Sequence, residues 1–329
     1  MTFNYKNVFV LDTSTVVGPY EKKGPLNEYF DKVYNDLYNG AKTWEQAEAK
    51  LLKESIDLLL TKTKKKETDL IIGGDLLNQI TASSYGVEEF NTPFIGIYGA
   101  CSTSTEGITI ASSLIDDGKI NNAIVSVSSH NMSSEKQFRN PTEYGAPKPS
   151  TATFTSTGGA SIFLTNKKTS IKVDSSTIGK ISNAHIKDPF NMGAVMAPAA
   201  ADTIYNHLKD TKRKVDYYDL ILTGDLGIYG KEILIDLMKQ DYNIDISKNY
   251  NDCGTMLYDL KRQKEVMAGG SGPVCSALVN YGYILNQLKK KKLKRVLLVA
   301  TGAMFSPTLV YQKQDILSTA HAVSLEVIS

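Results

Sequence analysis

An eight-residue pattern occurs twice in this chain of 329 residues and constrains its fold more than any other feature. Residues 69–76 are DLIIGGDL, and residues 219–226, which lie 150 positions later, are DLILTGDL, so six of the eight positions are identical. Each copy follows a segment with helical spacing of apolar residues and predicts a buried strand that ends in a Gly-Asp turn. Apolar strands ending in glycine are common, but the matched surroundings favour a duplication.

The segments that follow each copy also correspond. Helices predicted at 102–116 and 273–291 lead to strands at 122–128 and 295–301, and the halves close with strands at 160–164 and 322–327. The order βαβαβαββ therefore occurs twice. Strands separated by helices imply right-handed parallel crossovers, so we expect an α/β fold of two stacked half-sheets with helices between and outside them. We place the halves at 1–168 and 169–329.

Two helices precede the repeated strands. The first is predicted to begin with the capping box Thr43-x-x-Gln46 and to present Ala49, Leu52, Ile56 and Leu59 on one face. The second is predicted at 200–208. The Met-, Gly- and Ala-rich stretch before it, 191–198, is interpreted as a pocket wall.

Cys101 stands in YGACSTS (98–104), at the junction between two predicted elements. Residues 92–98 predict a short buried strand, and Ile108, Ala111 and Leu114 share one face of a helix that starts near 103. The free N–H groups and macrodipole at a helix start favour an anion, either a thiolate or a ligand carboxylate. The alternative is a small buried hydrophobe, since free cysteine is commonly buried.

Composition excludes several classes of protein. Lys and Arg total 37 against 35 Asp and Glu, which gives no charge imbalance that would indicate a nucleic-acid partner. Three cysteines without a CxxC pair predict free thiols, a reducing compartment and no metal knuckle. We expect neither a secretory leader nor a membrane span, because no suitable apolar run occurs.

Longer motifs carry a family resemblance. They are YGACSTSTEG (98–107), SSHNMSSEKQFRNPTEYGAPKP (128–149), NMGAVMAPAAADT (191–203), AGGSGPVCSA (268–277), SPT (306–308) and AHAV (320–323). The duplicated chain with a cysteine before a central helix resembles the thiolase superfamily and its ketoacyl synthase III branch. The motifs resemble the stage V sporulation protein AD family of spore-forming bacteria. This resemblance implies a thiolase-like fold, a five-layer α-β-α-β-α sandwich, and a homodimer.

The partners that a condensing enzyme needs are missing from their expected positions. Such enzymes use His and Asn beside the cysteine to handle protons and stabilise an oxyanion. In the slot for His this chain has 224–227, Gly-Asp-Leu-Gly, and in the slot for Asn it has 269–272, Gly-Gly-Ser-Gly. We therefore expect no catalytic residues. The alternative is an acyltransferase or condensing enzyme that uses Cys101 with an unconventional base.

The four histidines have separate expected positions. His207 is predicted on a helix surface, and His321 in a terminal strand. His185 lies in an irregular segment from which it could approach the pocket. His130 is predicted at a sheet edge near the cysteine helix.

The resemblance implies binding of dipicolinic acid, pyridine-2,6-dicarboxylate, for its uptake into the developing spore and its release in germination. Two carboxylates on a flat ring require two anion anchors and a planar apolar slot. We expect no cofactor and no metal site, with calcium present only as part of a calcium dipicolinate ligand. The candidate ligand-binding residues are Cys101, Ser102, Ser104, His130, Lys136, Phe138, Arg139, Tyr144, Lys148, His185, Asp225 and Ser271.

Within this set the expected roles differ. The Cys101 helix start, with Ser102 and Ser104, is a candidate for one carboxylate. Lys136, Lys148 and above all Arg139, whose planar fork matches a carboxylate, are candidates for the other. Phe138 or Tyr144 could cover the ring. Asp225 and its counterpart Asp75 are either turn residues or, for Asp225, part of the cavity, and Ser271 could donate to an anion.

The resemblance also implies where the protein works. Its expected partners are dipicolinic acid and the membrane proteins of the same uptake system, with no nucleic acid. The expected location is the cytoplasmic side, peripheral to the forespore or spore inner membrane. Basic residues at 289–292, 294 and 295 are by default a solvated helix end, and the alternative is docking on an anionic membrane.

Overall fold

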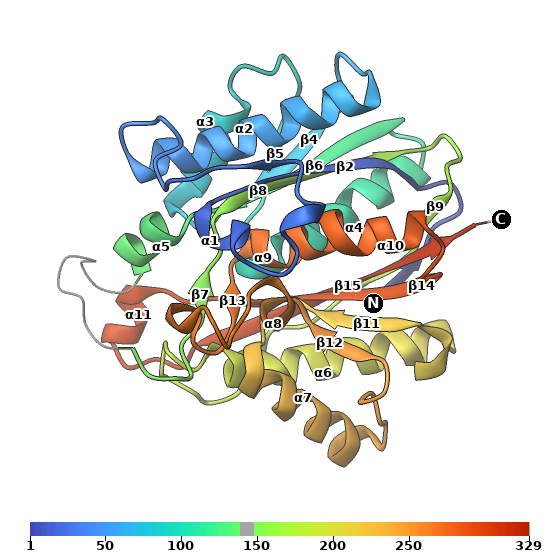
Figure 1. Cartoon of the computed structure of the whole chain (residues 1–329). Coiled ribbons are helices and arrows are strands. Elements are labelled where there is room, and N and C mark those ends of the chain that lie inside the picture. The colour runs from blue at the N-terminus through green and yellow to red at the C-terminus, as the bar shows by residue number, and fades with distance from the viewer. Residues whose placement is uncertain (139–147, 329) are drawn as a thin grey trace.

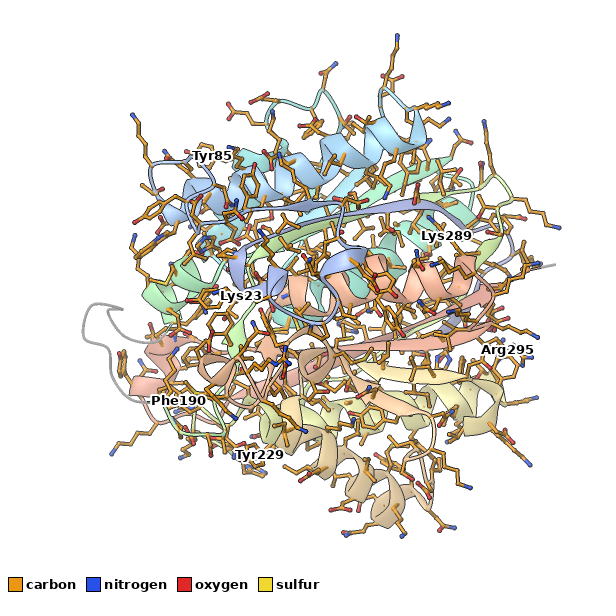
Figure 2. All side chains as sticks on the ribbon, in the orientation of Figure 1. Lys23, Tyr85, Phe190, Tyr229, Lys289 and Arg295 are labelled. Atoms are coloured by element: carbon orange, nitrogen blue, oxygen red, sulfur yellow. The ribbon has the colours of Figure 1, made fainter. Side chains whose placement is uncertain are left out.

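Five layers of secondary structure make up the molecule (Figure 1). The computed structural model describes residues 1–138 and 148–328. Helices α2 and α3 cover one half-sheet, α4, α9 and α10 lie between the two half-sheets, and α6 and α7 cover the other. Side chains fill the spaces between these layers (Figure 2). The predicted α/β sandwich with a thiolase-like layer order is confirmed.

The helices in the described residues are α1 (Pro19–Lys22), α2 (Trp44–Thr63), α3 (Thr81–Val87), α4 (Thr103–Asp116), α5 (Asn131–Phe138), α6 (Met192–Thr211), α7 (Gly227–Tyr242), α8 (Cys253–Leu257), α9 (Pro273–Leu278), α10 (Leu285–Lys289) and α11 (Pro307–Tyr311). The strands of the first half-sheet, in spatial order, are β5 (Phe94–Gly96), β4 (Ile71–Gly74), β6 (Asn122–Ser129), β8 (Gly158–Thr165) and β2 (Phe9–Val17). Those of the second are β12 (Tyr250–Asp252), β11 (Leu220–Thr223), β14 (Arg295–Ala303), β15 (Leu317–Val327) and β9 (Ile171–Ile178).

The two half-sheets repeat one topology. In each, the third strand along the chain lies at one edge and is followed in space by the second, fourth, fifth and first. The fifth strand, β8 or β15, runs antiparallel to both of its neighbours, and the remaining pairs are parallel. A bridge between Phe9 and Lys172 joins the half-sheets. The repeated sequences supply β4 and β11, which occupy the same place in each half, as a duplication requires.

Short strands complete the structure. They are β1 (Thr2–Asn4), β3 (Lys32–Val33), β7 (Phe154–Thr155), β10 (Ser182–Asn183) and β13 (Gly270–Ser271). Strands β7 and β13 pair in parallel and tie the two halves of the chain together. This small sheet positions side chains of both halves beside Cys101.

Helix α2 begins where its capping sequence predicts. Thr43 Oγ1 accepts a hydrogen bond from the Gln46 backbone N–H at 3.2 Å, which satisfies one of the free donors of the first turn. The return bond of the capping box differs, because Gln46 Oε1 accepts from Lys42 N at 3.3 Å. The buried face includes Leu52, Ile56 and Leu59 as predicted, while Ala49 is only half-buried.

Three predicted elements need correction. The helix expected at 200–208 is α6, whose twenty residues begin at Met192, include residues 192–198 and accommodate Pro198 in the interior. The helix expected at 273–291 contains a π-helical segment, Val279–Ile284, between α9 and α10. The strand expected to be buried at 92–98 is β5, and Ile95 is 41% exposed, because β5 lies at the sheet edge with β4 as its partner.

Candidate functional site

Cys101 occupies a 3-10 turn, Ala100–Ser102, that leads directly into α4. The residue before it, Ala100, has φ +50°, a left-handed backbone conformation that residues other than glycine rarely adopt. Such backbone strain at a pocket is typical of functional sites. Cys101 is 9% exposed as a residue, and its thiol faces Ser271 on β13, in the second half of the chain.

A short chain of polar groups connects the thiol to a buried carboxyl group. Cys101 Sγ lies 3.8 Å from Ser271 Oγ on β13, and the Ser271 hydroxyl donates to Asp225 Oδ2 at 2.9 Å. Asp225 follows β11 and also accepts from the Thr301 hydroxyl at 2.8 Å and from Gly272 N at 3.3 Å. Because the single Ser271 proton points to Asp225, the Cys101 thiol is the donor toward Ser271.

The surroundings of Cys101 oppose ionisation of its thiol. Burial raises the pKa of Cys101 well above its ordinary value, and the nearby Asp225 carboxylate raises it further. Burial also raises the pKa of Asp225, although its hydrogen bonds act the other way. The helix start was predicted to favour an anion, either a thiolate or a ligand carboxylate. The thiolate is contradicted, because desolvation and a like charge outweigh the macrodipole and keep the thiol neutral at neutral pH, while the ligand carboxylate stays a prediction.

A small cavity opens beside the sulfur. Its volume is about 60 Å³, room for about two water molecules at ~30 Å³ each and well below the ~300–1,000 Å³ of most small-molecule sites. Apolar and aromatic side chains form most of the wall, and a few polar groups are among the lining residues. The lining residues are Leu76, Tyr98, Ala100, Cys101, Ser134, Glu135, Phe138, Thr155, Met192, Met196, Ser271, Ala303 and Phe305.

Helix α5 forms one side of this cavity. The Phe138 ring lies 5.6 Å from that of Phe305, at an interplanar angle of 43°. Ser134 is 3% exposed, and its hydroxyl oxygen has no partner among the described residues. A buried hydroxyl without a partner is unfavourable, so a ligand or water that bonds it is favoured.

Charge at the cavity is balanced by an ion pair. Glu135 Oε2 lies 2.7 Å from Lys148 Nζ, and the two side chains are 8% and 25% exposed. Behind α5, the Ser133 hydroxyl donates to the buried Glu48 carboxyl at 2.6 Å and so attaches α5 to α2. The described residues hold no group of three or more His, Cys, Asp or Glu side chains able to bind a metal ion.

The structure brings together only part of the predicted set. Cys101, Phe138 and Ser271 line the cavity, with Asp225 directly behind Ser271. Lys148 lies one contact away, through Glu135, whereas Lys136 pairs with Glu45 at 2.6 Å outside this cavity. The Ser102 hydroxyl donates to Gly99 O, and the Ser104 hydroxyl meets Ser276 in the interior. The candidates Arg139 and Tyr144 lie outside the described residues.

Each of the four histidines is bonded elsewhere. His130 Nε2 donates to Leu37 O at 2.7 Å, and burial lowers its pKa to about 4. His185 is exposed and its Nδ1 lies 3.0 Å from Asp315, away from the cavity lining. His321 accepts from Gly179 N.

His207 is a correction. It was predicted on the surface and is fully buried, 2.8 Å from the Thr177 hydroxyl and 2.6 Å from that of Tyr218. Both ring nitrogens have partners, and this makes burial of the imidazole tolerable.

Several lining residues escaped the sequence reasoning. Ser134 and Glu135 lie in the 128–149 motif, in which the predicted carboxylate and ring contacts were basic and aromatic residues. Tyr98 is the first residue of the motif 98–107, and Phe305 directly precedes the motif SPT (306–308). Met192 and Met196 belong to the stretch interpreted as a pocket wall, and their three-to-four-residue spacing on α6 places both on the cavity.

The two repeated aspartates have separate roles. Asp75 accepts from Leu77 N at 2.8 Å and from Ser83 N at 2.7 Å, as expected of a turn residue. Asp225 instead accepts from Ser271 and Thr301, and a different residue, Asp252, binds the backbone of the following turn at Leu226. One copy therefore shapes a turn and the other lies beside the sulfur.

Comparison with known proteins places this chain in a family. The family model for stage V sporulation protein AD (SpoVAD) matches residues 1–326. The chain belongs to the stage V sporulation protein AD family. The stage V sporulation protein AD of Bacillus subtilis (strain 168) is 46% identical over 321 residues, which cover 97% of this chain and 94% of that protein.

Solved structures of other proteins have a fold similar to that of this chain. A variant of OleA from Xanthomonas campestris bound with cerulenin has a TM-score of 0.62 at 15% identity, over 98% of both chains. The 3-oxoacyl-[acyl-carrier-protein] synthase III of Aquifex aeolicus VF5 has a TM-score of 0.55 at 11% identity, over 97% of this chain and 99% of that one. The predicted resemblance to thiolase-like proteins is confirmed at the level of fold.

Proposed function

We propose that this sporulation protein binds dipicolinic acid without catalysis and takes part in its uptake into the developing spore and its release in germination. Membership of the family supports the biological setting. The observation that carries the non-catalytic part is the neutral, buried thiol, whose polar neighbours are a hydroxyl and a carboxyl group. A site without a thiolate lacks the nucleophile that acyl transfer requires.

The cavity has the chemistry that a flat aromatic acid needs. Tyr98, Phe138 and Phe305 offer aromatic surfaces for the pyridine ring. The unpartnered Ser134 hydroxyl is a donor for one ligand carboxylate. Since the cavity holds about 60 Å³, ligand entry requires movement of its walls. Phe138, at the end of the short helix α5, is the wall that we expect to move.

The Glu135–Lys148 pair defines two ways to accept a dianion. Free dipicolinate would draw Lys148 away from Glu135 and would be opposed by the Glu135 charge. Calcium dipicolinate would instead use the Glu135 carboxylate as an oxygen ligand for the ion. Since calcium neutralises the dianion, the second way adds no net charge to the cavity.

Isothermal titration of the full chain with dipicolinate, with and without calcium, tests the proposal. We expect saturable binding that Ser134→Ala weakens about tenfold, since a hydrogen bond to a charged group contributes ~1.5–3 kcal/mol. Ser84→Ala, at an exposed serine on α3, is the matched control and should bind as the parent does. Absence of binding by the folded parent chain, under both conditions, would refute the proposal.

We also propose that the protein works at the cytoplasmic side of the forespore or spore inner membrane, beside the membrane proteins of the same uptake system. None of the helices in the described ranges has the length and apolar character needed to cross a bilayer. Lys289 ends α10 and pairs with Asp12 at 2.6 Å, and Figure 2 shows it at the end of the middle layer. Lys290, Lys291 and Lys292 are exposed in the next turn and are available to an anionic surface.

A homodimer is the third part of the proposal. Strand β5 is the edge of the first half-sheet and contains Ile95, which is 41% exposed, and Tyr98, which is 43% exposed, follows two residues after the strand. An open edge with exposed apolar side chains favours pairing with another chain. Pairing with β5 of a second copy would cover both residues.

The second candidate function is acyl transfer or condensation at Cys101. The hydrogen bonds that connect the thiol through Ser271 to Asp225 favour this function, because they offer a path from the thiol proton to the Asp225 carboxylate. Incubation with an acyl-CoA followed by mass spectrometry separates the two functions. Acylation of Cys101 with turnover would support the enzyme, and an unmodified thiol would support the receptor.

A further inference from the structure

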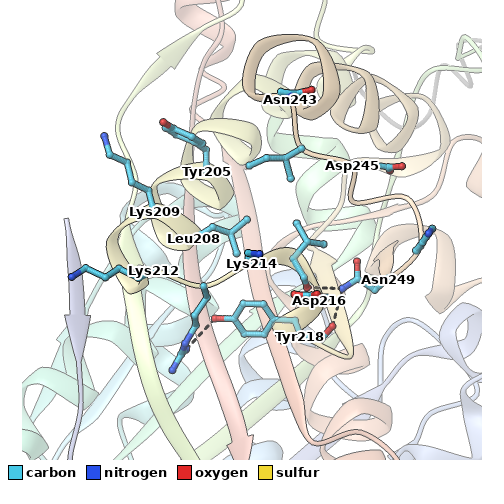
Figure 3. A pocket seen from close by; sticks show the side chains of 14 residues that line it. Tyr205, Leu208, Lys209, Lys212, Lys214, Asp216, Tyr218, Asn243, Asp245 and Asn249 are labelled. Atoms are coloured by element: carbon cyan, nitrogen blue, oxygen red, sulfur yellow. Dashed lines mark hydrogen bonds between the residues drawn. The ribbon is translucent and has the colours of Figure 1, made fainter.

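A second concave site lies at the far end of α6 from Cys101 (Figure 3). Its volume is about 770 Å³, within the ~300–1,000 Å³ typical of ligand sites. Helix α6 starts at Met192 in the Cys101 cavity and ends at Thr211 beside this second site. At ~1.5 Å per residue the two sites are roughly 30 Å apart. We call it the basic groove, after Lys209, Lys212, Lys214 and Lys248, which line it.

The four lysines come from separate parts of the chain. Lys209 and Lys212 are at the end of α6, Lys214 is in the following turn, and Lys248 is in the loop between α7 and β12. All four are exposed, and within the described residues none lies within 4.0 Å of a carboxylate oxygen. Two carboxylates, Asp216 and Asp245, also line the groove, so the positive charge predominates.

Arg213 holds this part of the chain in place. Its Nη2 lies 2.8 Å from Asp174, its Nη1 lies 3.4 Å from Glu326, and Nη1 donates to the Tyr218 hydroxyl at 3.1 Å. The bond to Tyr218 is visible in Figure 3. Since two carboxylates neutralise Arg213, the free charge of the groove belongs to the lysines.

The groove also has an apolar surface. Leu208, Val215 and Ile244 line it together with Tyr205, whose ring stacks on Tyr242 at 4.4 Å between centroids. Lysines that only neutralise the end of a helix lie in its last turn. This explains Lys209 and Lys212 but neither Lys214 nor Lys248. Convergence of like charges from two elements over an apolar surface is instead the arrangement of an anion site.

We propose that the basic groove binds a phosphate ester, with its phosphoryl group at the lysines and its organic part on the apolar surface. Lysine is a common phosphate ligand, acting as a point charge. Ammonium groups from α6 and from the loop before β12 would contact a phosphoryl group from two sides. The ester is either a soluble nucleotide or a phospholipid headgroup, since both present this chemistry.

Binding of two soluble probes and of vesicles to the full chain tests the inference. The soluble probes are ATP and pyrophosphate, measured by isothermal titration, and the vesicles are phosphatidylglycerol in phosphatidylcholine, measured by sedimentation. The test variant is Lys212→Glu with Lys248→Glu. The control is Lys261→Glu with Lys264→Glu, the same charge change at exposed lysines outside the groove.

We expect one class of probe to bind saturably, more weakly as salt rises, and about tenfold or more weakly in the test variant. The control should retain the parent affinity. Binding of ATP or pyrophosphate would identify a soluble ester, and binding of vesicles alone would identify a headgroup. Failure of every probe to bind, or equal binding by the test variant, would overturn the inference. Dipicolinate titration of the test variant should be unchanged, so the two sites are tested separately.

Discussion

Glu21 provides the most quantitative test of the structure. It lies in α1 and is fully buried, where Oε1 accepts hydrogen bonds from the Tyr258 hydroxyl and from Thr157 N, the latter at 3.0 Å. Its Oε2 has no partner among the described residues. Burial raises the pKa of Glu21 from its ordinary 4.5 to about 7, against the effect of these hydrogen bonds.

The free energy that follows is large for a single side chain. At ~1.4 kcal/mol for each pH unit between the two pKa values, ionised Glu21 reduces the free energy of unfolding by about 3 kcal/mol. Because the folded-state pKa is the higher one, this reduction is absent below about pH 4.5 and grows as pH rises. It is complete above about pH 7.

Glu21→Gln removes the charge and keeps a carbonyl oxygen for Tyr258 and Thr157. Urea unfolding of parent and variant at pH 5 and pH 8, followed by circular dichroism, measures the effect. We expect the variant to gain about 2 to 3 kcal/mol relative to the parent between these two pH values. Other buried carboxyl groups titrate equally in both chains, so their contributions cancel in this difference.

Glu67→Gln is the matched control, since Glu67 is exposed, and its stability should follow that of the parent at both pH values. Parallel pH dependence of the parent and Glu21→Gln would show that the buried carboxyl does not ionise with the shifted pKa. The reasoning about desolvation at this position would then be wrong.

Three further predictions concern the proposed site and interface. Asp225→Asn removes the carboxylate that helps to raise the pKa of Cys101, so labelling of Cys101 by a disulfide reagent at pH 8, located by mass spectrometry, should be several-fold faster; an unchanged rate would contradict the pairing. Glu135→Gln should strengthen binding of free dipicolinate and weaken binding of calcium dipicolinate in titration, whereas equal effects on both would exclude a role for Glu135 in holding the ion. Ile95→Glu should convert a dimer to a monomer in analytical ultracentrifugation, and a dimer that survives would place the interface elsewhere.

The fold was largely predictable from the sequence because the same order of strands and helices occurs twice along the chain. The repeated strands and the helix–strand order after them identified β4, β11 and their neighbours. Exposure was harder to predict: the apolar segment around Ile95 is typical of a buried strand, but its position at the edge depends on strand order in space. His207 shows the opposite case, since its burial depends on Thr177, thirty residues away in sequence.

The site was predictable only in part, for a related reason. The motif around Cys101 identified the thiol, and the resemblance to condensing enzymes identified Asp225 and Ser271 in the segments that replace the expected His and Asn. The roles of Ser134 and Glu135 depend on contacts that the sequence does not show. The Ser134 hydroxyl has no partner among the described residues, and the Glu135 carboxylate pairs with Lys148. Likewise, the thiol pKa depends on depth and on a carboxylate 124 positions away along the chain.

The separate roles of Asp75 and Asp225 have a consequence for how this molecule tolerates change. In the first half, Asp75 binds the backbone of the turn after β4. In the second half, Asp252 binds the backbone of the corresponding turn after β11, so Asp225 is not needed for that turn. A substitution at Asp225 therefore alters the surroundings of the sulfur while the scaffold persists, whereas the same substitution at Asp75 weakens the scaffold itself.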